Sequence, residues 1–214
     1  MLIQPKSKLL MIGDSITDCG RERPIAEGTG TLGNGYVSLV DGLLGAAYPG
    51  LGIRVVNMGV GGNTIRDLKA RWQTDVLGLK PDWLSIMIGI NDVWRRFGDE
   101  ALRPDHVPQK EYEKTLEDLV RRTLPQLKGL ILITPYYIEP DRADSMRAMM
   151  DRYGEVVKQL ASKYRAVFVD AQAAFDLVLQ DIPPATLSVD QVHPNLTGHM
   201  ILARAVLKAI GYDW

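Results

Sequence analysis

Short apolar segments alternate with longer amphipathic segments along the chain, and this alternation constrains the fold more than any other feature. Five apolar runs of five or six residues are predicted to be strands: residues 8–13, 53–58, 83–88, 129–134 and 166–170. Helical spacing of apolar residues predicts helices over residues 36–48, 64–77, 111–124, 145–164, 171–180 and 195–210. Strands separated by helices form parallel sheets with right-handed crossovers. The sequence therefore predicts a three-layer α/β/α sandwich around a five-stranded parallel sheet.

Composition excludes several classes of protein. The 214 residues carry 25 Lys+Arg and 26 Asp+Glu, a formal net charge of −1, which argues against a nucleic-acid partner. Cys19 is the single cysteine, so no disulfide can form within the chain, as is usual in a reducing compartment. The first residues lack the apolar core and cleavage site of a signal peptide, and no apolar run is long enough for a membrane helix. We expect a cytoplasmic protein with no membrane partner.

Ser15 follows the first predicted strand in the run Gly13-Asp14-Ser15. Ligands of open parallel sheets bind at the carboxyl ends of the strands, so this position faces the expected site. A serine at the start of a helix there is well placed to act as a nucleophile. A plain helix N-cap is the alternative, and the three-residue motif alone does not decide between the two.

Glycines follow the second strand and an asparagine follows the third. Gly59, Gly61 and Gly62 allow close backbone approaches, so that their N–H groups can point into a cleft. A dinucleotide-binding fingerprint fits poorly, because Thr64 occupies its third glycine position, whereas a tight turn without a ligand stays open. Asn91 can aim a side-chain N–H into the same cleft, or it can form an Asx turn or an N-cap.

One of the three histidines stands out by its neighbours. His193 follows Asp190 by three residues in a loop that leads into the last helix. His106 lies in a charged loop and is expected to be solvated, and His199, inside a helix, is expected to be structural. Cys19 is expected to be a small buried side chain. No cluster of histidines and cysteines predicts a metal site.

Together these four segments, which contain Ser15, the glycines, Asn91, and Asp190 with His193, supply the groups that acyl transfer requires. These groups are a nucleophile, a base, a group that orients the base, and N–H donors for an oxyanion. The four blocks GDSITD, GGNT, GIND and DQVHP resemble those of the SGNH hydrolases, the GDSL-type lipase/esterase superfamily. Longer runs such as NTIRDLKARW and HPNLTGHMILARA are similar to the bacterial acetylxylan esterase branch of that superfamily.

The resemblance implies a catalytic role for each matching position. Ser15 would be the nucleophile, His193 the general base, and Asp190 the group that orients His193. The oxyanion hole would use the backbone N–H groups of Ser15 and Gly62 and the side-chain amide of Asn91. The neighbouring Gly61 remains an alternative to Gly62.

The resemblance also bears on the whole chain. It implies one SGNH hydrolase domain over residues 1–214 with a flavodoxin-like sheet, no metal and no organic cofactor. Members of the related branch tend to self-associate, so we expect a homo-oligomer.

The substrate is less constrained than the chemistry. Trp94 and Arg95 follow the third block and could line an acyl or sugar pocket, although Trp94 could instead pack the base of the loop over residues 95–109. That loop and the loop over residues 135–144 are charged, which favours short acyl groups on a polar scaffold. We therefore predict a serine esterase that removes acetyl groups from xylo-oligosaccharides or related sugars. The alternatives are a lipase, lysophospholipase or thioesterase of the same superfamily, and a non-catalytic glycan-binding module.

Overall fold

A six-stranded sheet forms the centre of the protein in a computed structural model, which describes residues 1–28, 30–97 and 105–214. In these residues the strands are β1 (Lys8–Gly13), β2 (Ala26–Glu27), β3 (Arg54–Asn57), β4 (Trp83–Met87), β5 (Gly129–Ile133) and β6 (Val167–Val169). The five predicted parallel strands are confirmed, each within one residue of its expected bounds. The predicted total of five is wrong because β2 adds an antiparallel edge strand, and its two residues are too short to show a period.

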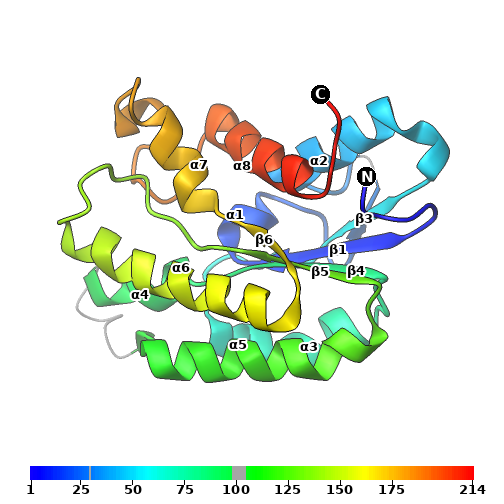
Figure 1. Cartoon of the computed structure of the whole chain (residues 1–214), viewed down its shortest axis with the longest axis horizontal. Helices are drawn as coiled ribbons and strands as arrows, with labels where there is room; N and C mark the ends of the chain where they lie inside the picture. The colour runs from blue at the N-terminus through cyan, green and yellow to red at the C-terminus, as the bar shows by residue number, and fades with distance from the viewer. Residues whose placement is uncertain (29, 98–104) are drawn as a thin grey trace.

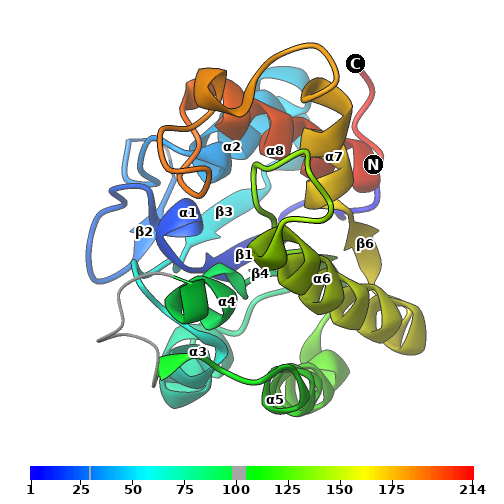
Figure 2. The same ribbon diagram turned by 90° about the vertical axis from the view of Figure 1, so that its left-hand side faces the viewer.

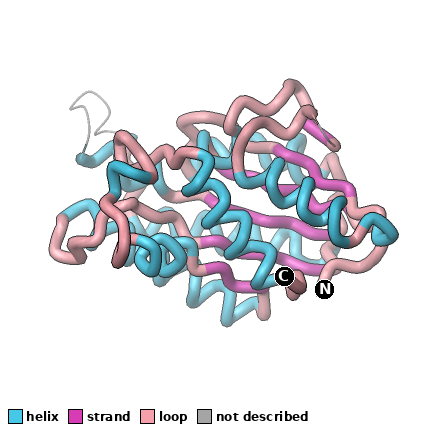
Figure 3. The backbone as a smooth tube through the Cα atoms, turned by 90° about the horizontal axis from the view of Figure 1, so that it is seen from above, coloured by secondary structure: helices cyan, strands magenta, loops and turns pink. Residues whose placement is uncertain are grey.

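Helices cover both faces of the sheet, as the alternation of segments predicts (Figure 1). One layer holds α2 (Tyr36–Ala47), α7 (Ala171–Val178) and α8 (Leu196–Ala209), and the other holds α3 (Ile65–Trp72), α5 (Gln109–Thr123) and α6 (Ser145–Tyr164). Figure 3 shows the strands lying side by side between these layers, with the two chain termini close together at one end. Near those termini the Leu2 N–H donates to the Ile210 carbonyl at 2.7 Å.

Two short helices lie just beyond strand ends, α1 (Ser15–Asp18) and α4 (Ile90–Phe97). The sequence predicted the start of α1 at Ser15 but not its extent, and it did not predict α4. Because α4 runs to Phe97, the first residues of the loop expected over residues 95–109 are helical instead. Residues 98–104 of that loop lie outside the described residues. Helices of one or two turns show too few apolar positions for a period to be recognised.

The helix expected over residues 64–77 changes form within its length. Thr64 is its N-cap, as predicted, and the Thr64 N–H donates to the Asp67 carboxylate at 2.8 Å. The α-helix ends at Trp72 and continues as a π-helical turn over Gln73–Leu77.

The order of the strands determines where a ligand can bind. The parallel strands lie in the order β3-β1-β4-β5-β6, so the chain crosses from one side of β1 to the other between β3 and β4. This is the flavodoxin-like order, in which the crevice at the carboxyl ends of the two strands flanking the reversal is the usual ligand site. Figure 2 looks onto that edge of the sheet and shows α1, α3 and α4 gathered there.

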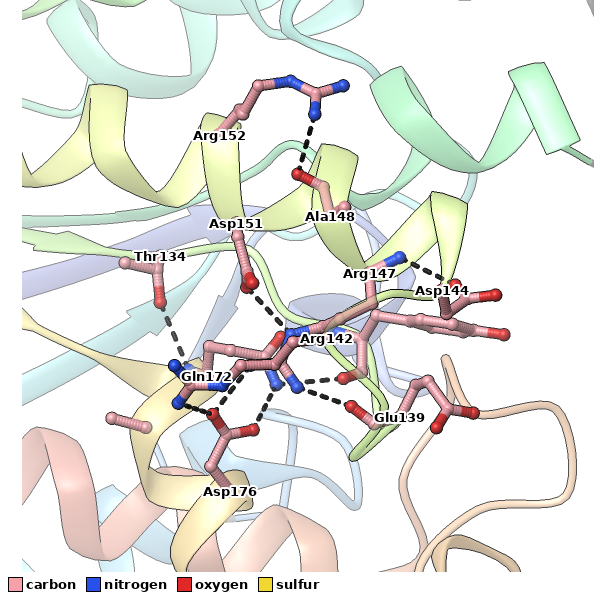
Figure 4. Close-up of polar contacts among 12 residues, drawn as sticks. Thr134, Glu139, Arg142, Asp144, Arg147, Ala148, Asp151, Arg152, Gln172 and Asp176 are labelled. Carbon is pink, nitrogen blue, oxygen red and sulfur yellow. Dashed lines mark hydrogen bonds and ion pairs between the residues drawn. The ribbon is translucent and has the colours of Figure 1, made fainter.

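A buried arginine joins the two helical layers at the same end of the sheet (Figure 4). The Arg147 side chain of α6 is only 2% exposed and donates to Asp151 at 2.8 Å and to Asp176 of α7 at 2.7 Å. A third N–H of its guanidinium donates to the Glu139 carbonyl. A buried charge is tolerated only where its donors find such partners, so this cluster fixes α6 against α7.

Of the helices that the structure describes, none combines the length and the apolar character that crossing a membrane requires.

Candidate active site

Ser15 is the first residue of α1 and stands half-buried where β1 ends. The buried carboxyl of Asp14 caps the helix by accepting the Ile16 N–H at 3.0 Å. A Cβ on Gly59 would lie 2.1 Å from the Asp18 nitrogen, so only glycine lets α1 pack against the end of β3. The helix start that the sequence predicts for Ser15 is confirmed.

His193 and Asp190 lie beside Ser15, although 178 positions separate Ser15 from His193 in the chain. The His193 Nε2 atom lies 2.9 Å from the Ser15 Oγ atom, and the His193 Nδ1 atom lies 2.7 Å from an Asp190 carboxylate oxygen. In the tautomer with the proton on Nδ1, His193 donates to Asp190 and leaves Nε2 free to accept the Ser15 proton. The structure thus brings the three predicted catalytic side chains into one hydrogen-bonded line.

Asp190 is held in its charged form by the groups around it. Its second carboxylate oxygen accepts the N–H groups of His193 at 2.8 Å and Val192 at 3.0 Å, and the Ser188 hydroxyl at 3.0 Å. Partial burial alone would raise the pKa of Asp190, but these hydrogen bonds and the one from the His193 ring hold it well below its usual range. A permanently ionised Asp190 can orient a neutral imidazole and stabilise the imidazolium that forms when Ser15 loses its proton.

The predicted oxyanion donors differ in which of their N–H groups already have an acceptor. The backbone N–H groups of Ser15 and Gly62 have no acceptor among the described residues. The Gly61 N–H, by contrast, already donates to the Asp18 carboxylate at 3.0 Å. The Asn91 side-chain nitrogen donates one N–H to the Asn63 carbonyl at 3.0 Å, which leaves its second N–H available.

The two residues predicted to bind substrate, Trp94 and Arg95, both lie on α4. The Trp94 ring stands edge-on to the His193 ring, with 5.9 Å between ring centroids and 70° between planes. Arg95 donates to the Gly62 carbonyl at 2.6 Å and so holds the glycine turn. Trp94 thus flanks His193, whereas Arg95 contacts the backbone of the turn.

Polar side chains behind the site, among them Asn57, hold the backbone of its loops. The Asn57 amide donates to the carbonyls of Thr17 at 2.7 Å and Leu32 at 2.8 Å and accepts the Gly59 N–H at 2.9 Å.

The remaining histidines are both hydrogen-bonded. His106 was expected to be solvated, but it is half-buried and its Nδ1 atom lies 2.6 Å from the Asp92 carbonyl. The structural role expected for His199 is confirmed: it is buried, and its Nδ1 atom accepts the Tyr36 N–H at 3.2 Å. Burial lowers the pKa of His199 to about 4. Its Nε2 atom lies 3.4 Å from the sulfur of Cys19, which is half-buried.

Two buried carboxyls make the stability of the fold depend on pH. Burial raises the pKa of Asp14 and of Asp92 to about 7, and hydrogen bonds from the backbone N–H groups of Ile16 and Ile65 offset only part of that effect. Because the folded state binds these protons more tightly than the unfolded chain, their contribution to the free energy of unfolding falls as the pH rises from about 4 to about 7.

We expect Asp92→Asn, which resembles the protonated acid and keeps an acceptor for the Ile65 N–H, to flatten this pH dependence. The measurement is the melting temperature of the wild type and the variant at pH 5 and at pH 8. The substitution Asp181→Asn, at an exposed aspartate, is the control and should leave the difference unchanged. An equal pH dependence in Asp92→Asn and the wild type would contradict the expectation.

Sequence reasoning assigned no role to Asp18, Asn63 or Arg71. Asp18 occupies the Gly61 N–H, Asn63 orients the Asn91 amide, and Arg71 contacts the Asn63 side chain at 2.7 Å. Asn63 and Arg71 belong to the run NTIRDLKARW, but a separation of eight residues does not predict a contact. In the described part of the chain, no group of three or more His, Cys, Asp or Glu residues is arranged to hold a metal ion.

Comparisons of the sequence with known proteins identify a family and a similar enzyme. The GDSL-like Lipase/Acylhydrolase family matches residues 11–201 of the chain. An acetylxylan esterase from Geobacillus stearothermophilus is 59% identical over 215 residues, which span 100% of this chain and 98% of that protein.

Solved structures extend the agreement to three dimensions. Crystal structures of the Geobacillus esterase superpose with a TM-score of 0.98, and three of them are of catalytic mutants in which a serine, a histidine or an aspartate is replaced by alanine. An α/β hydrolase from the metagenome of Lake Arreo, Spain, is 52% identical, covers 99% of this chain and 98% of its own, and superposes with a TM-score of 0.96. The chain belongs to the GDSL-like lipase/acylhydrolase family.

Proposed function

We propose that the chain is a serine esterase that removes acetyl groups from xylo-oligosaccharides through an acyl-enzyme on Ser15. The observation that carries this proposal is the line of hydrogen bonds from Ser15 through His193 to Asp190, with distances of 2.9 and 2.7 Å. The identity of 59% to an acetylxylan esterase over the whole chain supports the substrate class.

The proposed reaction has two halves. The Ser15 Oγ atom attacks the ester carbonyl while His193 Nε2 takes its proton, and the imidazolium, stabilised by Asp190, then protonates the departing sugar hydroxyl. A water molecule, activated by the same His193 nitrogen, next attacks the acetyl-enzyme and releases acetate. Each step passes through a tetrahedral species whose oxygen is negatively charged.

The oxyanion hole in this proposal uses the N–H groups of Ser15 and Gly62 and the Asn91 amide. Gly62 is favoured over Gly61 because the Gly61 N–H is already occupied by the Asp18 carboxylate. Donors fixed before the reaction stabilise the developing charge without reorganising, which is the largest single contribution in many enzymes of this kind.

A short acyl group on a polar scaffold suits the surroundings of the base. The His193 side chain is 44% exposed, so the reacting atoms are open to a bulky soluble substrate. Trp94, half-buried beside His193, offers an apolar edge against which an acetyl group or a sugar ring can pack.

Rates on a series of esters test the proposal. We expect acetylated xylo-oligosaccharides to react faster than acetylated glucosamine. We also expect p-nitrophenyl esters to lose about tenfold or more in kcat/KM between the acetyl and octanoyl chains, because the acyl site of the proposed enzyme admits acetyl and excludes extra methylenes. A serine-directed inhibitor should abolish all of these activities. Faster hydrolysis of long-chain esters would indicate a lipase, lysophospholipase or thioesterase, and binding of glycans without hydrolysis would indicate a non-catalytic module.

We further propose that this esterase acts in the cytoplasm as a homo-oligomer. The single cysteine supports a reducing compartment, and self-association in the related branch supports the oligomer. Light scattering coupled to size-exclusion chromatography tests the assembly, and a mass of one 23.8 kDa chain would contradict it.

A further inference from the structure

Arg71 lies in the last turn of α3, behind the loops that carry the proposed catalytic groups. Side chains of a helix lean toward its N-terminus, so the long Arg71 side chain runs back toward the glycine turn from which α3 begins. Only 16% of this side chain is exposed. Its guanidinium is therefore largely shielded from solvent.

The guanidinium contacts the ends of two strands and the glycine turn at once. Its N–H groups donate to the carbonyls of Gly13 at 2.9 Å and Met58 at 2.8 Å, and to the Asn63 side-chain oxygen at 2.7 Å. Gly13 closes β1 just ahead of the nucleophile, and Met58 follows β3 at the start of the turn. A rigid planar fork of five donors can hold three such acceptors in fixed relative positions, which the single ammonium of a lysine cannot do.

Asn63 connects this contact to the oxyanion hole. The Asn63 carbonyl accepts one N–H of the Asn91 amide at 3.0 Å, and this bond fixes the direction of the other N–H. Arg71 holds Asn63 through its side chain while Asn63 holds Asn91 through its backbone. A displacement of Asn63 therefore turns the Asn91 amide away from the reacting oxygen.

Two observations indicate a geometric rather than an electrostatic role for Arg71. Its charge is paired with Asp75 at 2.8 Å, which reduces the field that it exerts at the reacting oxygen. The Gly13 carbonyl already accepts the Val60 N–H at 3.1 Å, so the Arg71 bond adds a constraint to an acceptor that is already satisfied.

We propose that Arg71 is a positioning residue of the oxyanion hole, which fixes the glycine turn against the end of β1 and, through Asn63, orients the Asn91 amide. The inference rests on the proposed esterase function. Stabilisation of an oxyanion is realised only in the transition state, so losing it lowers kcat and leaves KM nearly unchanged.

The test is the kinetics of Arg71→Met on p-nitrophenyl acetate, alone and in the Asn91→Ala background, at a temperature at which every variant is folded. We expect kcat to fall by about 10- to 100-fold with KM within about threefold, since a small misplacement of a catalytic group costs that much. In Asn91→Ala the same substitution should cost less than about threefold, because coupled residues are not additive. The pH profile of kcat/KM should keep its shape, because the contacts of His193 and Asp190 are untouched.

Controls separate this role from a loss of folding. Arg66→Met removes an exposed arginine of the same helix, which pairs with Glu111 at 2.6 Å, and it should leave kcat unchanged. Asn63→Ala removes the acceptor of Arg71 in a half-buried turn, and it should lower kcat in the same direction even where Arg71→Met does not fold.

The possible failures are distinguishable. An Arg71→Met enzyme with the kcat of the wild type, or with an equal loss in the Asn91→Ala background, overturns the inference alone. A wild type without Ser15-dependent esterase activity overturns the proposed function and the inference with it.

Discussion

Ser15→Ala is expected to lower kcat on p-nitrophenyl acetate by about 10⁵- to 10⁶-fold, because serine hydrolases lose that much when either the nucleophile or its base is removed. The Ser15 hydroxyl has His193 as its hydrogen-bond partner among the described side chains, and it stands half-buried at the surface of the site. Its removal therefore leaves no buried polar group unpaired. The melting temperature and the affinity for an acetylated xylo-oligosaccharide should stay near those of the wild type.

A second substitution shows whether Ser15 and His193 act as one unit. His193→Ala should cost about as much as Ser15→Ala, and the double variant should be no slower than either single variant, since each alone already removes the covalent route. Ser162→Ala, on the exposed face of α6, is the matched serine control and should keep full activity. A Ser15→Ala enzyme that retained most of its esterase activity would exclude Ser15 as the nucleophile.

Asn91→Ala is expected to lower kcat by about 10²- to 10³-fold, which corresponds to about 3–4 kcal/mol of transition-state stabilisation. Asn91 lies on the first turn of α4 and is 6% exposed, and the Asn63 carbonyl holds one N–H of its side chain, which leaves the other available to an oxyanion. The oxyanion exists only during the reaction, so KM should change little. Steady-state kinetics on acetyl esters measures both quantities.

An isosteric variant sharpens this second test. Asn91→Asp keeps the shape of the side chain but replaces the donor by a carboxylate, which accepts hydrogen bonds and repels a developing negative charge. Its kcat should therefore be at least as low as that of Asn91→Ala. A loss of kcat of less than about tenfold in either variant would be smaller than the loss seen when one such donor is removed. Such a result would contradict the role of Asn91 as an oxyanion donor.

The strands were predictable because each is an apolar run bounded by glycine, proline or a charged residue, and a strand buried on both faces needs such a run. β4 illustrates this: the run WLSIM follows Pro81 and is buried at every position. The short elements α4 and β2 escaped prediction, and α1 was predicted only by its start at Ser15, because these elements contain too few residues for a hydrophobic period to emerge.

The candidate catalytic side chains were predictable for a different reason. Ser15, Asn91 and His193 occur in short blocks whose residue types match the parts of acyl transfer, and their order along the chain follows the order of the strands. The contacts that hold these blocks in place carry no such signature. Arg71 is one of several arginines on amphipathic helices, and nothing in its local sequence distinguishes it from the exposed Arg66.

The sequence by itself determined the layered α/β fold, the candidate nucleophile, base and orienting carboxylate, and the exclusion of an internal disulfide. Only the tertiary structure decided which of two adjacent glycines has an N–H without an acceptor in the described part of the chain, since the Gly61 N–H is occupied by Asp18. It also placed His106 on the backbone of α4 and the Arg71 guanidinium on three loop acceptors. The physical reason is that hydrophobic periodicity and residue chemistry are present in a local stretch of sequence. The partner of a hydrogen-bond donor, by contrast, depends on segments that are distant in sequence and meet only when the sheet and its helices have packed.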